Sequence, residues 1–383
     1  MKRTLSSQSS APALSQLKIA IVHDWLVGGG AEKVVLALHE MFPKAPIYTS
    51  YCTDTWRKKL DNKVVTGFLQ YWPLSKLRKF LPLLRIWWFE HLDLTGYDLV
   101  ISSSGNGEAK SVKKLNKKAL HICYCHSPTH FYWDKHEEYL KSPGFGIFNP
   151  LARLGLKILV RPLQKYDLKA ANRPDYFVAN STHIQRLIKK YYNRDSIVIH
   201  PPVDVDRFAP RSGSGSPASK LGFVTVGRQT PYKRTNIIIE ACNRLKLPLT
   251  VIGYGPEHQK LIKMAGPTIN FIENASDEDI ENYLAKAQAL IFAAYEDFGI
   301  APVEALAAGT PVIAYKAGGA LDYVNQETGL FFDKQTTDSL VEILKKFNSK
   351  NFDQKNLLKN AAEFSKQQFI NKFKQFLEKK CTF

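Results

Sequence analysis

The chain has 383 residues, a formal net charge of +18 and 44% hydrophobic residues. This length allows two domains with substantial cores, and this composition excludes an intrinsically disordered chain. The positive charge favours an anionic partner, whether nucleic acid, a membrane surface or a phosphorylated substrate, and charge alone does not choose among them.

Residues 1–16 are polar and aperiodic, so we expect a disordered N-terminal tail without the apolar segment of a secretory signal. Residues 17–200 then alternate strand-like and helix-like segments. Apolar runs predict buried parallel strands at 18–24, 45–51, 97–104, 119–125 and 176–181. A glycine turn, Gly28, Gly29 and Gly30, separates the first strand from an amphipathic helix.

Residues 201–220 are rich in Pro, Gly and Ser and are predicted to form a hinge linker. Alternation resumes over 221–365, with strands predicted at 221–228, 248–255, 269–273, 289–295 and 311–318. The whole pattern predicts an α/β protein with two Rossmann-like doubly wound domains facing a cleft. Residues 366–383 are predicted to form a basic amphipathic helix that packs back on the first domain.

The five cysteines are scattered, without the spacing of a zinc site, and no apolar run reaches the roughly 18 residues of a membrane-spanning helix. We therefore expect a reduced, cytoplasmic protein. Cys123 and Cys125 point to one face of a predicted strand, where core packing is favoured over metal or redox chemistry.

Basic residues follow the first strand of the second half in the segment "VGRQTPYKR". Arg228 stands where the strand ends, and Lys233 and Arg234 stand just before a predicted helix. A helix N-terminus favours anions, so these cations predict a diphosphate site. The alternative is a solvated basic loop.

Two acids, Glu296 and Glu304, flank seven residues between a strand and a helix. Paired carboxylates occur in glycoside hydrolases as acid and base. Here Glu296 is predicted in a loop and Glu304 in the first helical turn, a geometry that instead favours binding of sugar and ribose hydroxyls. The alternative for Glu304 is electrostatic stabilisation of the helix N-terminus.

Several motifs together resemble glycosyltransferase family 4, whose members are retaining enzymes with the GT-B fold. The resemblance extends from Lys18 onward. It rests on residues 296–314, "EDFGIAPVEALAAGTPVIA", on "GRQTPYKR", on "HPPVDVDRF" at 200–208 and on "GGALDYVNQETGLFF" at 318–332. It is strongest to the branch that includes bacterial O-antigen and exopolysaccharide mannosyltransferases using GDP-mannose.

The resemblance implies that the nucleotide sugar binds mainly to the second domain and the acceptor to the first. Arg228 and Lys233 would bind the diphosphate, Glu296 the donor sugar and Glu304 the ribose. The N–H groups of Phe298, Gly299 and Ile300 would face the sugar or phosphate. These fixed cations would replace a divalent metal, so no metal or other cofactor is expected.

In the first domain, the resemblance places the loop of Gly28, Gly29 and Gly30 near the donor phosphate, and His126 near the sugar as a further catalytic residue. His130 stands where relatives often have Arg, and the loop expected near the base has Glu273 and Asn274 where they often have Gly-Arg. Lys110 is a weaker candidate for contact with phosphate or acceptor.

Residues 56–92 and 145–170 mix Lys and Arg with Trp, Phe and Leu. Such segments can lie in the interface of an anionic membrane, which would suit a lipid-linked acceptor. The alternative is a pair of ordinary helices with their apolar faces in the core.

The sequence thus predicts a transferase that moves mannose from GDP-mannose to a glycan or lipid-linked glycan, in the cytoplasm or on the inner face of the plasma membrane. Alternatives are a UDP-sugar donor, or an idle GT-B protein that binds glycan or membrane. A nucleic-acid partner is not expected, because no recognised binding module accompanies the charge.

Overall fold

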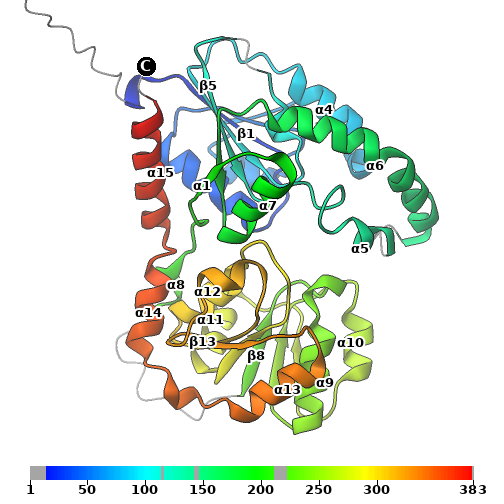
Figure 1. Ribbon diagram of the computed structural model, residues 1–383, viewed down its shortest axis with the longest axis vertical. Coiled ribbons are helices and arrows are strands. Elements are labelled where there is room, and N and C mark those ends of the chain that lie inside the picture. The colour runs from blue at the N-terminus through cyan, green and yellow to red at the C-terminus, as the bar shows by residue number, and fades with distance from the viewer. Residues whose placement is uncertain (1–13, 114–115, 142–145, 211–221, 382–383) are drawn as a thin grey trace, which may run out of the picture. The chain divides into compact units, whose positions relative to one another are not determined.

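The computed structural model describes residues 14–113, 116–141, 146–210 and 222–381, which form two compact units (Figure 1). The first unit contains the chain up to Ala179, Leu187–Ile199 and the chain from Ile370 onward. The second contains Asn180–Arg186 and His200–Phe369. The expected disordered tail, except its last three residues, and the predicted linker from 211 onward lie outside the described residues.

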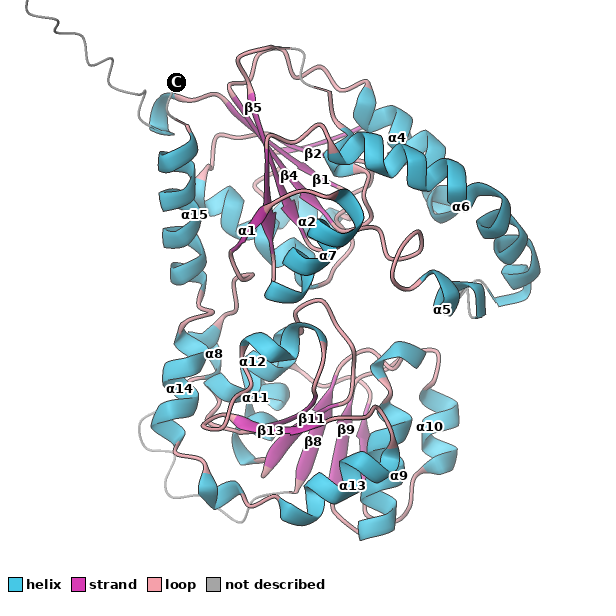
Figure 2. Ribbon diagram, in the orientation of Figure 1, coloured by secondary structure: helices cyan, strands magenta, loops and turns pink. Residues whose placement is uncertain are grey.

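A parallel seven-stranded sheet forms the centre of the first unit (Figure 2). In chain order its strands are β1 (Ile19–His23), β2 (Ile47–Thr49), β3 (Val64–Thr66), β4 (Leu99–Ser104), β5 (Leu120–Cys125), β6 (Tyr176–Ala179) and β7 (Ser196–Val198). Their order in the sheet is β3-β2-β1-β4-β5-β6-β7. The order changes direction between β1 and β4, which is the topological switch point of a doubly wound sheet.

Helical segments of the first unit connect these strands. The α-helices are α1 (Gly30–Met41), α2 (Asp54–Lys59), α3 (Leu74–Leu77), α4 (Pro82–Glu90), α5 (His136–Lys141), α6 (Asn149–Ala171) and α7 (Thr182–Tyr192), whose first residues belong to the second unit. Short 3-10 helices are η1 (Leu14–Gln16), η2 (Phe68–Gln70), η3 (Arg78–Phe80), η4 (Ala109–Ser111) and η5 (Gly146–Phe148).

The second unit repeats this plan around a parallel sheet of order β10-β9-β8-β11-β12-β13. Its strands are β8 (Phe223–Val226), β9 (Leu249–Ile252), β10 (Ile269–Ile272), β11 (Ala289–Phe292), β12 (Val312–Tyr315) and β13 (Gly329–Phe332). Its helical segments are α8 (Val205–Phe208), η6 (Pro231–Lys233), α9 (Thr235–Leu245), α10 (His258–Met264), α11 (Asp277–Lys286), α12 (Ile300–Ala307), η7 (Gly318–Asp322), α13 (Thr337–Lys346), η8 (Ser349–Asn351), α14 (Gln354–Ala362) and the first residues of α15 (Lys366–Lys380).

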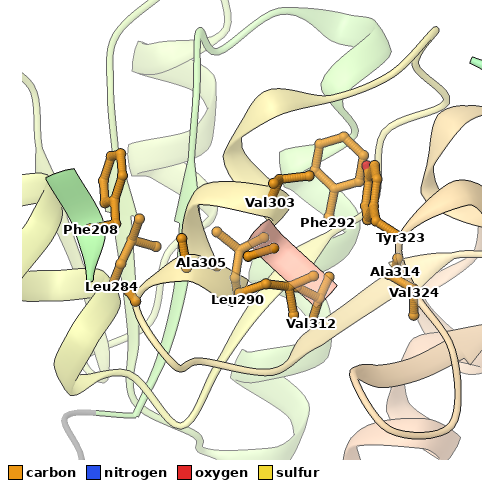
Figure 3. Packing of buried hydrophobic residues seen from close by; sticks show 14 of the residues in the cluster. Phe208, Leu284, Leu290, Phe292, Val303, Ala305, Val312, Ala314, Tyr323 and Val324 are labelled. Atoms are coloured by element: carbon orange, nitrogen blue, oxygen red, sulfur yellow. The ribbon is translucent and has the colours of Figure 1, made fainter. Parts of the chain in front are cut away.

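The core beside α12 determines where the candidate site lies. Val303 of α12 is fully buried and belongs to one cluster with Leu290 and Val312 of the sheet (Figure 3). Phe292 and Tyr323 extend this cluster toward the carboxyl ends of the strands. Small residues on α12, including Ala305, let the helix lie close to the sheet, so its N-terminus is held at that edge.

The predicted α/β class with two doubly wound domains is confirmed, and two details differ from expectation. The sequence missed β3, β7 and β13, which are all edge strands of three or four residues. The expected linker contains α8, whose Phe208 is buried in the core of the second unit. No helix in the described ranges is long and apolar enough to cross a membrane.

The C-terminal helix packs on the first unit from Ile370 onward. Phe373 is fully buried, with its ring centroid 6.4 Å from that of Tyr124, and Phe376 makes an edge contact with Tyr176 at 6.1 Å. Cys123 and Cys125 are buried in the same unit, which confirms their predicted packing role, and burial raises the pKa of Cys123 to about 12.

Candidate active site

A pocket lies at the topological switch point of the second unit, between the ends of β8 and β11. Its walls come from the carboxyl ends of β8, β9 and β11 and from the start of α9. Ligands of open α/β sheets bind at such points. The lining residues are Thr225, Val226, Gly227, Arg228, Gln229, Lys233, Thr235, Val251, Ile252, Phe292, Ala293 and Ala294.

Two predicted diphosphate ligands, Arg228 and Lys233, both line this pocket. The chain turns sharply after β8 at Gly227, whose φ of 146° suits glycine. A Cβ at Gly227 would stand 3.6 Å from the Lys233 amino group, so the amino group lies over this turn. The guanidinium of Arg228 is exposed and has no hydrogen-bond or ion-pair partner in the described part of the chain.

Glu296, the predicted sugar ligand, forms an ion pair with Lys233. Their side chains are 17% and 21% exposed, so both remain accessible to a ligand. Lys233 follows β8 and Glu296 follows β11, so the pair spans the switch point. The sequence predicted both residues in the site but assigned them to different parts of the ligand, and their mutual contact is a new finding.

Close backbone contacts hold the Glu296 loop in place. At Gly318, with φ 67°, a Cβ would stand 2.2 Å from the carbonyl oxygen of Glu296. The N–H of Gly319 donates to that same carbonyl at 2.9 Å. Tyr323 donates from its hydroxyl to the Phe298 carbonyl at 2.8 Å, and burial first, then the charge of Glu296, raises the pKa of Tyr323.

The start of α12 offers free backbone donors beside this loop. Gly299 precedes the helix with φ 85°, and a Cβ there would be 2.8 Å from both Phe292 and the Tyr323 hydroxyl. The N–H groups of Phe298, Gly299 and Ile300 have no hydrogen-bond acceptor among the residues that the structure describes. The side chain of Phe298 itself belongs to the core, at 3% exposure, so only its backbone is available to a ligand.

Glu304 lies in the second turn of α12, not in the first turn that the sequence predicted, because the helix begins at Ile300. Its charge acts on Arg207 of α8. Burial lowers the pKa of Arg207, but the carboxylates of Glu281, Asp277 and Glu304 together raise it by more, so the net pKa is raised. Stabilisation of a helix N-terminus therefore does not explain Glu304, since only first-turn charges act strongly there.

A buried histidine, His258, connects the loops after β8, β9 and β10. Sequence reasoning missed this role of His258. Gln229 donates from Nε2 to the Gly253 carbonyl at 2.6 Å, so its Oε1 accepts from Nδ1 of His258 at 2.7 Å. Nε2 of His258 is 2.9 Å from Oε1 of Glu273. The two ring nitrogens of His258 thus contact Gln229 and Glu273, and the imidazole holds Glu273 at the strand edge. The only sequence signal was a histidine three residues after the strand predicted at 248–255.

In the first unit, the glycine loop lies after β1 but has a different partner from the one expected. Gly28 has φ 120° and donates its N–H to Glu32 Oε1 at 2.8 Å, and the N–H of Val27 approaches the same oxygen at 3.3 Å. Glu32 therefore already occupies these amides. Gly29 precedes α1 and Gly30 is its first residue; their contact with donor phosphate stays a prediction.

His126 lies directly after β5, at the switch-point edge of the first sheet. Its Nε2 is 2.8 Å from the Ser103 hydroxyl, which in turn is 3.0 Å from Nδ1 of His23. The carboxylate of Asp24, which the sequence did not single out, accepts from the backbone of Gly105 and two neighbouring residues. This cluster orders the edge of the sheet, and the role of His126 at a sugar stays a prediction.

Lys110 cannot contact phosphate in this conformation, so that weaker candidate is wrong. Its side chain is 1% exposed, and Nζ lies 2.5 Å from Asp167 Oδ1. His130 is hydrogen-bonded to Asp134 at 3.0 Å. Among the described residues, no group of three His, Cys, Asp or Glu side chains is arranged to bind a metal ion.

Comparison with known families agrees with this arrangement. Residues 28–207 match the model described as Glycosyltransferase Family 4, and residues 206–366 match the model described as Glycosyl transferases group 1. With the two doubly wound sheets, these consecutive matches place the chain among the glycosyltransferases with the GT-B fold.

Individual proteins give more distant matches. A D-inositol 3-phosphate glycosyltransferase of Streptomyces scabiei is 27% identical over 176 residues, which is 38% of this chain and 39% of the relative. The chain thus spans about two fifths of the length of the curated relatives it matches. The Anabaena protein Alr3699/HepE, solved with UDP and glucose, is similar with a TM-score of 0.66 and 17% identity, over 94% of this chain and 99% of that one. Sucrose-phosphate synthase from Thermosynechococcus elongatus is similar with a TM-score of 0.67 and 17% identity, over 94% of this chain and 98% of that one.

Proposed function

We propose that this chain is a retaining glycosyltransferase that moves mannose from GDP-mannose to a glycan or lipid-linked glycan in cell-surface polysaccharide synthesis. The observation that carries the transferase proposal is the Lys233–Glu296 ion pair at the β8–β11 switch point, beside Arg228 and the free N–H groups of α12. The cations suit a diphosphate and the carboxylate suits sugar hydroxyls.

The residues of this pocket have clear roles in the proposed reaction. The bond from the anomeric carbon to the phosphate oxygen breaks, and its electron pair stays on the phosphate. The acceptor hydroxyl oxygen bonds to that carbon, and its proton passes to the departing phosphate, so no protein base is required. Negative charge grows on the phosphate in the transition state, and Arg228 and Lys233 therefore stabilise the transition state more than the ground state. This difference accelerates the reaction. Retention is inferred from the family resemblance.

Supporting the choice of GDP is the carboxylate of Glu273 at the end of β10, in the loop where the family resemblance places the base. Guanine presents two adjacent donors, N1–H and the 2-amino group, which suit one carboxylate. Uracil presents a single N–H between two carbonyls, and these oxygens would repel it. The contact with Nε2 of His258 at 2.9 Å holds the Glu273 side chain at this edge.

The main experiment is calorimetric binding of GDP-mannose, UDP-glucose and UDP-N-acetylglucosamine to the wild type and to Glu304→Ala, with and without EDTA. We expect selective GDP-mannose binding that is unaffected by EDTA and weakens in the variant through loss of ribose hydrogen bonds. Conversion of a glycan acceptor by the wild type, and anomeric analysis of the product, would then test transfer and retention. If the wild type bound none of the three nucleotide sugars and neither GDP nor UDP, the proposal would be overturned in favour of a catalytically idle binding protein.

Glu273→Gln tests the base assignment separately. The neutral amide replaces one acceptor by a donor, so we expect GDP affinity to fall roughly 10- to 100-fold, in line with about 1.5–3 kcal/mol for a charge-assisted hydrogen bond. UDP affinity should not fall. A UDP-sugar donor is the second candidate, favoured by the UDP and glucose bound to the similar Anabaena protein. Selective binding of UDP by the wild type would establish that alternative.

A further inference from the structure

The first unit presents a broad apolar surface on α3, α4 and α6, which we call the α4–α6 face. Its exposed side chains are Leu77, Phe80, Leu83, Leu84, Trp87, Phe148, Leu151, Leu154, Ile158 and Leu159. Several are more than half exposed, including Leu151 at 66% and Ile158 at 63%. Apolar patches of this extent on soluble proteins mark interaction sites.

Helix α6 has a row of apolar residues on its solvent-facing side, in addition to those on its inward side. Leu151, Leu154 and Ile158 follow one another at helical spacing and are all exposed. Its buried residues begin only at Leu163, so the first half of the 23-residue helix buries none of its side chains. An ordinary surface helix turns its apolar stripe toward the core, so core packing does not account for this exposed row.

Helices α4 and α6 lie side by side in the first unit (Figure 1), and contacts join the segments that carry the exposed side chains. The rings of Phe80 and Phe148 lie edge to face, 6.4 Å apart, and join η3 to η5. Ile86 of α4 and Leu163 of α6 share a small buried cluster. Contacts within the two helices and between the segments that precede them therefore hold α4 and α6 together.

The charge around this face identifies its partner. Helix α6 carries five basic residues and a single acid, Asp167, which is buried in an ion pair. Lys157, Arg161 and Lys165 are exposed next to the apolar stripe. A second copy of the chain would bring two such basic rims together, which is repulsive, whereas anionic lipid headgroups attract them.

We propose that the α4–α6 face docks on an anionic lipid bilayer, with α6 lying in the interface. The leucine and isoleucine side chains would enter the acyl boundary and Trp87 would sit at headgroup level, where tryptophan is enriched. The basic side chains would contact lipid phosphates. This inference stands on the first unit alone and does not depend on the proposed sugar transfer.

Flotation with phosphatidylglycerol-containing vesicles, compared with pure phosphatidylcholine vesicles, tests the proposal. We expect binding to the anionic vesicles that weakens with salt. Leu154→Glu/Ile158→Glu should abolish it, and Lys157→Gln/Arg161→Gln/Lys165→Gln should weaken it about a hundredfold, at about fivefold for each charge. Ile262→Glu is the matched control, because Ile262 is 42% exposed on α10 of the second unit.

The outcomes separate the occupants of the face. Circular dichroism and melting curves confirm that each variant is folded. Unchanged vesicle binding in the glutamate variant, or an equal loss in Ile262→Glu, would overturn the proposal. A lipid-free oligomer that dissociates in the glutamate variant, without vesicle binding by the wild type, would assign the face to a second copy instead. GDP binding, measured in parallel, reports on the proposed function independently.

Discussion

Removal of the Lys233 amino group is the sharpest test of the pocket. Lys233→Met keeps an unbranched apolar stem of similar length but removes the charge that lies over the turn at Gly227. A hydrogen bond to a charged group contributes about 1.5–3 kcal/mol, and each 1.4 kcal/mol is about tenfold in affinity. We therefore expect GDP to bind roughly 10- to 100-fold more weakly to Lys233→Met.

The assay is calorimetric titration with GDP and, in parallel, with guanosine, which has no phosphate. Guanosine affinity should not change if Lys233 binds the diphosphate and not the base, as proposed. Lys316→Met is the matched control, since Lys316 pairs with Asp333 on the surface with side chains 55% and 76% exposed. Exposed pairs of this kind contribute little, so GDP affinity should be unaltered there.

The variant also leaves Glu296 without its cation, so that effect must be separated from ligand binding. Glu296→Gln removes the same ion pair but keeps Lys233. If Lys233 acts only by holding the Glu296 loop, both variants should weaken GDP binding equally. Equal losses, an unchanged GDP affinity in Lys233→Met, or a matching loss of guanosine binding would refute the diphosphate role.

Three further predictions concern the framework of the site. Gly318→Ala should lower stability by about 1–3 kcal/mol and weaken GDP binding, because its Cβ would collide with the Glu296 carbonyl; Gly96→Ala, with open space around it, should do neither, as melting curves and titration will show. Burial raises the pKa of Asp322, but hydrogen bonds from a histidine and a threonine lower it by more, so the net pKa is lowered. Asp322 is thus stabilising above its unfolded pKa and loses this effect as the pH falls through its lower folded-state pKa, so the stability deficit of Asp322→Asn at pH 7 should begin to shrink only below about pH 4 and disappear at still lower pH; a pH-independent deficit would contradict this. Phe373→Ala should cost about 3–5 kcal/mol in denaturant unfolding, and a loss under 1 kcal/mol would contradict its core position.

The fold was predictable because central parallel strands are continuous apolar runs with a strong signal. Strands such as β11, fully buried on both faces, were therefore found. The missed edge strand β7 has three residues, none of them buried, so its sequence lacks that signal. Short edge strands form because a neighbouring strand offers hydrogen bonds, which is tertiary information that a local pattern does not contain.

The pocket was predictable where sequence neighbours form it, as with Arg228 and Lys233 after β8. The role of His258 was not, because it depends on hydrogen bonds to Gln229 and Glu273 from two other loops. Lys110 illustrates the opposite error: it follows a strand as a ligand would, but α6 supplies Asp167 from 57 residues away and buries the amino group. Long-range pairing decided both cases.

The membership of α15 in both units has a consequence for how the protein is made. The core of the first unit includes Phe373, which follows the whole second unit along the chain. During synthesis the second unit can collapse while the first still exposes the surface around Tyr124 and Tyr176. The first unit therefore depends on a late, long-range contact, which slows folding and prolongs exposure of apolar surface. A fragment that stops at the hinge would lack this helix, so the N-terminal half of the chain does not contain the whole core of the first unit.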